Sequence, residues 1–143
     1  GDKAMYCGGL GSGAVSKIVN NLIGLSVGVL LSEAFTMGIK AGVDAQTLFE
    51  AVSGSSGNTA SMRSFPNGIF QRNFDPGFQV DLAAKDVGLA TQLGRDLRVP
   101  MEMSNIAQQR YIDAQNKGWG RLAAGAVARV QEERSGVEIK PNE

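Results

Sequence analysis

Residues 8–21 read Gly-Gly-Leu-Gly-Ser-Gly-Ala-Val-Ser-Lys-Ile-Val-Asn-Asn, a glycine cluster that leads directly into a long apolar segment without proline. Glycines let the backbone approach a ligand or another chain segment closely. Ser12 is the expected N-cap of the helix that follows. Lys17 and Asn21 are four residues apart, so they share one helical face. A cation and an amide near a helix N-terminus are suited to binding a small anionic substrate.

The composition indicates one globular domain. The chain has 143 residues, enough for a single sizeable core, and its 43% hydrophobic content is typical of a globular protein. Lys plus Arg and Asp plus Glu number 14 each, and this balance favours neither a nucleic-acid partner nor a membrane surface. Residues 1–7 lack the apolar core of a secretory signal, and the single cysteine allows no intrachain disulfide. A cytoplasmic location is therefore expected.

The chain contains no histidine and one cysteine, Cys7. This composition excludes Ser-His-Asp and Cys-His catalysis within the chain, as well as a zinc site of Cys and His ligands, and no metal is expected. Proton transfer would then fall to lysine, tyrosine or carboxylate groups, or to residues outside the chain. Cys7 is expected to be a buried small apolar residue rather than a nucleophile.

Hydrophobic periodicity predicts an all-α fold, a helical bundle around one long buried helix. That helix should run from Ser12 to about Ala41, a stretch without proline that ends at Gly42. Its apolar residues fall on nearly all faces, so it is expected to be buried as the central element of the domain or of an interface. Further helices are expected over residues 45–52, 60–63, 78–97, 100–118 and 119–133. Asp44 should cap the first of these, and Pro66 should follow the end of the second. Residues 134–143 are polar and are expected to fray.

The glycine cluster does not match a phosphate-binding loop. Gly8 and Gly13 have the spacing of a Walker A loop, but Ala14 and Val15 stand where its lysine and hydroxyl residue should be. Residues 9–13 break the Gly-x-Gly-x-x-Gly dinucleotide fingerprint by one position, and no strand-helix-strand pattern follows. Both interpretations are rejected.

Lys17 is the sharper chemical candidate, set against the ordinary interpretation of a solvated helix lysine. Only three charged residues lie between residues 14 and 42, so a cation near the start of a helix expected to be buried indicates a function. Such a lysine can exchange a proton with a substrate hydroxyl. Asn21 would orient a carboxylate or a hydroxyl, and a purely structural amide is an equal alternative for Asn20. For Lys85 and Asp86, the spacing alone favours a surface pair.

These residues resemble the C-terminal domain of the β-hydroxyacid dehydrogenase family, which includes 3-hydroxyisobutyrate dehydrogenase and tartronate semialdehyde reductase. The family motif Gly-x-x-Gly-x-Gly-x-x-x-Lys-x-x-x-Asn is matched by Gly8, Gly11, Gly13, Lys17 and Asn21 with every spacing kept. The later Lys-Asp-Leu motif appears at residues 85–87, where Val87 replaces the leucine. Phe78 matches an aromatic that the family places near the nicotinamide, and the resemblance covers about residues 5–133.

The resemblance implies hydride transfer between NAD or NADP and a short β-hydroxyacid, or reduction of the matching semialdehyde. Lys17 would be the catalytic acid and base. Asn21, with Asn20 and Gly11, would bind the small carboxylate substrate. The cofactor would be bound mostly by another domain and contacted from this side by Lys85 and Phe78. The implied fold is that of the C-terminal domain of 6-phosphogluconate dehydrogenase.

The family places a Rossmann domain before this region, which implies that residues 1–11 are a strand remnant and hinge. Residues 12–133 would be the substrate and oligomerisation domain of a homodimer or homotetramer, and residues 134–143 a disordered tail. The chain alone would be inactive, and Lys17 and Asn21 should face an open groove. One alternative is a helical oligomerisation or protein-binding module without catalysis. A second alternative, closer to the proposed enzyme, is a reductase of another β-carbonyl acid.

Overall fold

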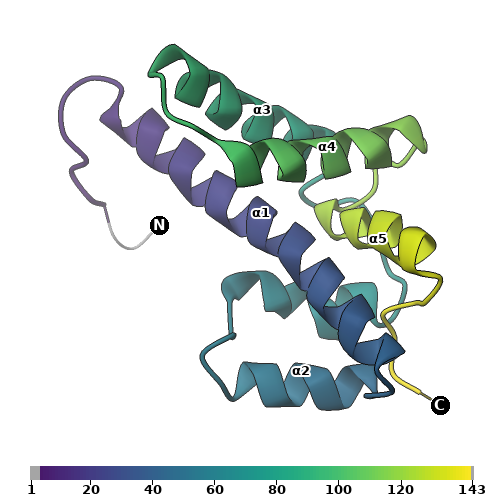
Figure 1. Ribbon diagram of the computed structural model, residues 1–143. Coiled ribbons are helices and arrows are strands. Elements are labelled where there is room, and N and C mark those ends of the chain that lie inside the picture. The colour runs from purple at the N-terminus through teal and green to yellow at the C-terminus, as the bar shows by residue number, and fades with distance from the viewer. Residues whose placement is uncertain (1–3, 143) are drawn as a thin grey trace.

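The computed structural model describes residues 4–142, which form a bundle of helices (Figure 1). Its α-helices are α1 (Ser12–Lys40), α2 (Ala45–Ser53), α3 (Val80–Asp96), α4 (Glu102–Asn116) and α5 (Ala128–Ser135). Three shorter helical turns are η1 (Ala60–Ser64), η2 (Phe65–Ile69) and η3 (Ala124–Val127). Within the described range, the only β-type pairing is an isolated bridge between Gln79 and Ala123. The predicted all-α class is confirmed.

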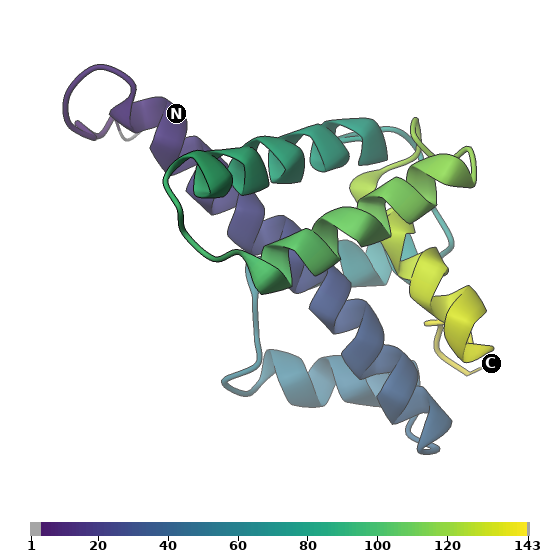
Figure 2. The same cartoon turned by 45° about the horizontal axis from the view of Figure 1, so that its top comes forward.

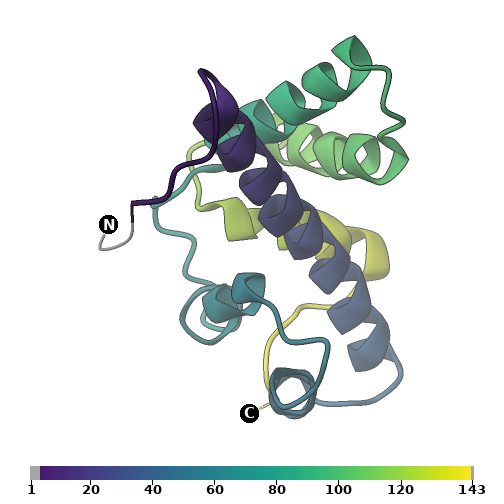
Figure 3. The same cartoon turned by 90° about the vertical axis from the view of Figure 1, so that its left-hand side faces the viewer.

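The helix α1 is the axis of the bundle. α3 and α4 lie side by side and pack against α1, whereas α2 lies beside its C-terminal end (Figure 1 and Figure 2). Figure 3 shows the α3–α4 pair on one side of α1 and the turns η1 and η2 on the other. One core cluster joins α1 to α3, α4 and α5, and a second joins it to α2, η1 and η2.

The bounds of α1 agree with the prediction to within one residue, but its burial does not. The side chains of Val15, Val19 and Ile23 are 45%, 48% and 60% exposed, and the buried residues of α1 all lie between Val29 and Thr36. Within residues 4–142 the first half of α1 is therefore not covered, and its burial in an interface stays a prediction. Composition shows that a face is apolar but does not show whether this part of the chain covers it.

Among residues 4–142, α1 is the one helix long and apolar enough to cross a membrane. A core helix of a soluble protein meets the same criterion, and α1 packs against α2, α3, α4 and α5.

The helix ends partly follow the predicted capping. Asp44 caps α2 as expected, since its Oδ2 accepts from the backbone N–H groups of Gln46 and Thr47. Ser12 is not the cap of α1: Gly11 occupies that position with φ 90°, a left-handed conformation that glycine adopts without strain. Pro66 follows the end of η1 at Ser64, as predicted, but it lies inside η2, a turn that the sequence did not predict. In η2 the N–H of Phe70 donates to the carbonyl oxygen of Phe65 at 2.9 Å.

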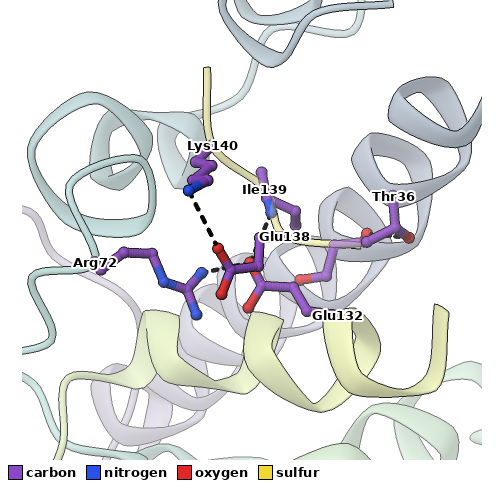
Figure 4. Close-up of polar contacts among 7 residues, drawn as sticks. Thr36, Arg72, Glu132, Glu138, Ile139 and Lys140 are labelled. Atoms are coloured by element: carbon purple, nitrogen blue, oxygen red, sulfur yellow. Dashed lines mark hydrogen bonds and ion pairs between the residues drawn. The ribbon is translucent and has the colours of Figure 1, made fainter. Parts of the chain in front are cut away.

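The C-terminal tail is packed rather than frayed (Figure 4). The carboxylate of Glu132 on α5 is buried and accepts from Arg72 at 2.6 Å and from the backbone N–H of Ile139 at 2.7 Å. The side chain of Ile139 is fully buried in the second core cluster. The N–H of Asn142 donates to Asp44 Oδ1 at 2.7 Å. The predicted disorder of residues 134–143 is thus wrong up to residue 142, and residue 143 lies outside the described range.

At the other end, residues 4–7 have no regular secondary structure and are exposed. Met5 and Tyr6 are 80% and 87% exposed, and Cys7 is exposed as a free thiol. The prediction that Cys7 is buried is therefore wrong in this chain. Residues 4–7 pair with no strand in the described range. The first three residues of the expected strand remnant and hinge lie outside it.

Candidate functional site

A cavity of about 780 Å³ opens along one face of α1. Lys17, Asn20 and Asn21 line one part of it, and turns η1 and η3 supply much of the opposite wall. Most of its walls are apolar side chains and glycine backbone, which is typical of small-molecule sites with few polar groups. Both Lys17 and Asn21 therefore face an open groove, as the sequence predicted.

The geometry of α1 explains why these side chains meet. Lys17, Asn21 and Gly28 follow one another at intervals of four and seven residues, which places them on one stripe of the helix. Gly24 and Gly28 on that stripe have no side chains, so the backbone of α1 forms the floor of the cavity. Tyr111 on α4 is buried and also lines the cavity, and its hydroxyl donates a hydrogen bond to the carbonyl oxygen of Leu25 at 3.1 Å. The same helical stripe thus provides polar groups at one end and open space along the rest.

Lys17 is exposed to solvent. Its position on a helix expected to be buried had suggested instead that its amine is shielded from water. Within residues 4–142, its amine has no carboxylate within 4.0 Å and no hydrogen-bond partner. The amine is therefore available to a bound molecule in the cavity.

Asn21 is held in one orientation by two neighbours. Its side-chain Nδ2 donates to Asp86 Oδ2 at 2.7 Å, and its Oδ1 accepts from Asn20 Nδ2 at 3.2 Å. A carboxylate only accepts hydrogen bonds, so Asp86 fixes which end of the Asn21 amide faces α3. The second N–H of that amide stays available for a ligand. Asn20 therefore has a structural contact with Asn21 and also lines the cavity.

Asp86 links the two sequence motifs. It is buried on α3, whereas Lys85 is 60% exposed and lies 3.1 Å from Asp86 Oδ1. Burial raises the pKa of Asp86, but the hydrogen bond from Asn21, the neighbouring Lys85 and the charge of Lys17 together outweigh it. The pKa of this carboxyl therefore lies below its usual range, and Asp86 is ionised at neutral pH. The spacing favoured a surface pair of Lys85 and Asp86, but only Lys85 is exposed.

Sequence reasoning assigned no role to Asp86, although a signal was present. Asp86 lies three residues after Ala83 and four before Ala90, both buried. A carboxylate at core spacing on a helix needs a partner, because an unpaired buried charge is costly. That requirement pointed to a donor on a neighbouring element, which the structure identifies as Asn21.

The other predicted site residues are placed differently. Phe78 is 44% exposed, lines the cavity, and is fixed through its carbonyl oxygen, which accepts from the N–H of Ala124 at 2.7 Å. Lys85 reaches the site only through Asp86 and does not line the cavity. Gly11, expected near the substrate, lies at the N-terminus of α1, outside the lining. Across the described residues, no group of three or more His, Cys, Asp or Glu could hold a metal ion.

Comparisons with known proteins identify the family of the chain. A family model described as the NAD-binding of NADP-dependent 3-hydroxyisobutyrate dehydrogenase matches residues 11–131. The 2-(hydroxymethyl)glutarate dehydrogenase of Eubacterium barkeri is 34% identical over 140 residues, covering 97% of this chain and 46% of that enzyme. The mitochondrial 3-hydroxyisobutyrate dehydrogenase of Rattus norvegicus is 31% identical over 135 residues, covering 89% and 40%.

A solved structure of 3-hydroxyisobutyrate dehydrogenase from Mycobacterium tuberculosis with L-serine has a TM-score of 0.81 to this chain at 27% identity, covering 89% of this chain and 46% of that one. The chain thus spans about half the length of the curated relatives it matches. The family description names both NAD and NADP, in agreement with the expected cofactor. The match includes the first motif from Gly11 onward and all of the second, and the chain belongs to the family of NAD-binding domains of NADP-dependent 3-hydroxyisobutyrate dehydrogenases.

Proposed function

We propose that this chain is the C-terminal catalytic and oligomerisation domain of an oxidoreductase. The enzyme would transfer hydride between NAD(P) and a small β-hydroxyacid of the 3-hydroxyisobutyrate or tartronate semialdehyde type. The observation that carries the proposal is the convergence of an exposed amine, Lys17, and an oriented amide, Asn21, in one cavity. The enzymes among its relatives act on compounds of this chemical class.

Lys17 and Asn21 take complementary roles in the proposed reaction. The Lys17 amine takes the proton from the substrate hydroxyl during oxidation and returns it to the carbonyl oxygen during reduction. The free N–H of Asn21 donates to the substrate carboxylate, and Asp86 holds the amide in the orientation that presents this N–H. Asn20 lines the same end of the cavity and supports Asn21. Holding the acid in this way places its hydroxyl near the lysine.

The residues expected near the cofactor suit a nicotinamide nucleotide. Phe78 presents an exposed aromatic ring at the cavity, and Lys85 presents an exposed amine beside Asp86, the partner of Asn21. When bound, NAD or NADP accepts or supplies the hydride. Phe78 would offer an apolar surface to the ring and exclude water, while Lys85 would bind a polar or anionic group of the cofactor.

The remainder of the enzyme is also a proposal. A nucleotide-binding domain of about 160 residues would precede this region, a size typical of one domain. Residues 4–11 would connect it to α1 as a strand end and hinge. The helical domains would associate in dimers or tetramers through apolar surface such as Val19 and Ile23, which are exposed in this chain. The cytoplasm is the proposed compartment, although the named rat relative is mitochondrial.

The test is steady-state kinetics of the full-length protein, followed by the absorbance of the reduced nicotinamide. Lys17→Ala should lower kcat by orders of magnitude, because the proton-transfer group is lost. Lys40→Ala is the matched control on the same helix, since Lys40 binds the carbonyl oxygen of Ser135 far from the cavity. A near-wild-type rate for Lys17→Ala would overturn the assignment. The chain alone should show no turnover. The protein-binding module would be favoured if the full-length protein is inactive with β-hydroxyacids and lacks an intact Gly-x-Gly-x-x-Gly fingerprint.

A further inference from the structure

We propose that Arg63 is a second anion-binding group of the cavity and that the substrate carries a second negative charge. This charge would lie on the substituent of the hydroxyacid, away from the carboxylate held by Asn21. The inference rests on the proposed function and narrows its substrate class from β-hydroxyacids to dianionic ones.

Arg63 is the second cation of the cavity. It lies on η1, is exposed, and lines the same cavity as Lys17. In residues 4–142 it forms no ion pair and no side-chain hydrogen bond, whereas Arg72 and Arg110 are paired with carboxylates at 2.6 Å. Its guanidinium is therefore available for a ligand.

The turn that carries Arg63 is fixed against α1. Ser61 Oγ donates to the carbonyl oxygen of Gly24 at 2.8 Å, and Ser64 Oγ donates to the carbonyl oxygen of Ser61 at 3.0 Å. Met62 and Phe65, close to Arg63 on either side, are buried in the core. Gly24 lies three residues beyond Asn21, about 4.5 Å along the helix axis. Arg63 therefore lies on a turn that is hydrogen-bonded to α1 one helical turn beyond Asn21.

The charges of the residues that line the cavity also favour a second anionic group on the ligand. Lys17 and Arg63 are both cationic, and no aspartate or glutamate is present among the described residues that line the cavity. A monocarboxylate bound by Asn21 and Lys17 would leave the exposed Arg63 guanidinium without a ligand and in contact with solvent only. A guanidinium binds a carboxylate through two parallel hydrogen bonds, which is stronger and more specific than a single contact. The volume of about 780 Å³ has room for a substrate with such an arm.

The test compares two substrates of nearly the same size in the full-length enzyme. One is 2-(hydroxymethyl)glutarate, and the other is 2-(hydroxymethyl)pentanoate, in which a methyl group replaces the distal carboxylate. Wild-type enzyme should prefer the dicarboxylate in kcat/KM. Arg63→Gln should lower kcat/KM for the dicarboxylate by roughly 10- to 100-fold, mostly through KM, and change the monocarboxylate value by less than about threefold. Arg121→Gln, an exposed arginine outside the cavity, is the control.

Equal losses with both substrates, or no loss with either, would overturn the proposal. A higher KM for NAD(P) in Arg63→Gln with unchanged discrimination between the acids would assign the guanidinium to a cofactor phosphate and would also overturn it. If the wild-type protein oxidises no hydroxyacid, the proposed function fails while Arg63 stays testable by calorimetry with glutarate and butyrate. Binding of glutarate that is tighter than that of butyrate and is lost in Arg63→Gln would support the second anion site, and any other result would exclude it.

Discussion

Asn21 on α1 donates to Asp86 on α3 across 2.7 Å, although the two residues are 65 positions apart in the chain. This hydrogen bond joins the glycine-lysine-asparagine motif to the lysine-aspartate motif. It brings the oriented amide, the buried carboxylate and the exposed Lys85 into one connected group.

Removing the Asp86 charge should weaken substrate binding. In Asp86→Asn the Asn21 amide faces a group that can donate as well as accept, so its orientation is no longer fixed. We expect kcat/KM of the full-length enzyme to fall about 10- to 100-fold, with much of the change in KM. Asp75→Asn, at an exposed aspartate in the loop before α3, serves as the control. An unchanged KM in Asp86→Asn would show that Asn21 does not depend on Asp86.

The same carboxyl should make stability depend on pH. Because the pKa of Asp86 is lower in the folded state than in the unfolded chain, the unfolded chain binds more protons and stability rises with pH. The contribution should be complete above the unfolded pKa of about 4 and be lost as pH falls through the lower folded value. Urea unfolding between pH 3 and pH 6 should show a shallower acid loss for Asp86→Asn than for the wild type. Parallel curves would contradict a lowered folded pKa.

The packed tail should contribute measurably to stability. Ile139 is fully buried, so Ile139→Ala removes apolar contacts and leaves a cavity that costs about 2–4 kcal/mol of unfolding free energy. Lys140→Ala alters an exposed neighbour and should change the unfolding free energy by less than about 0.5 kcal/mol. The urea midpoint of each variant measures the difference. Equal midpoints would mean that the tail contributes little to the folded state.

The exposed apolar stripe on α1 should matter for assembly more than for folding. Ile23→Glu alters a side chain that is 60% exposed, so the isolated chain should lose no more than about 0.5–1 kcal/mol of unfolding free energy. In the full-length protein, the same charge would be buried between helical domains and should shift dimers or tetramers toward monomers. Light scattering of wild type, Ile23→Glu and the control Glu33→Gln would show it. The same mass for all three would exclude this stripe as the contact.

Much of the fold could be read from local patterns. The long helix without proline, the Asp44 cap and the helical spacing of α3 and α4 depend on neighbouring residues, and the structure has all of them. The errors occurred where distant contacts decide. Ile139 in the largely polar tail is buried where its backbone N–H donates to Glu132, and no periodic pattern in the sequence predicts this contact.

The site was predictable to a similar degree. One helical turn places Lys17 and Asn21 together, and that juxtaposition follows from spacing alone. The partner of Asn21 could not be found in this way, since α1 and α3 must pack before Asp86 reaches it. Arg63 likewise enters the cavity because Ser61 ties its turn to α1, a contact between residues 37 positions apart.

The glycines that form the floor of the cavity leave room for a ligand but lower the stability of α1. A glycine inside a helix is less favourable than alanine by about 0.8–1 kcal/mol. At Gly24 a methyl group would meet nothing within 4 Å, and at Gly28 its nearest neighbour is the Tyr111 hydroxyl at 3.9 Å. Either position could therefore accept alanine without a clash, with a firmer helix and a shallower cavity as the result. A single methyl group at either position would thus trade ligand volume in the cavity for stability of α1.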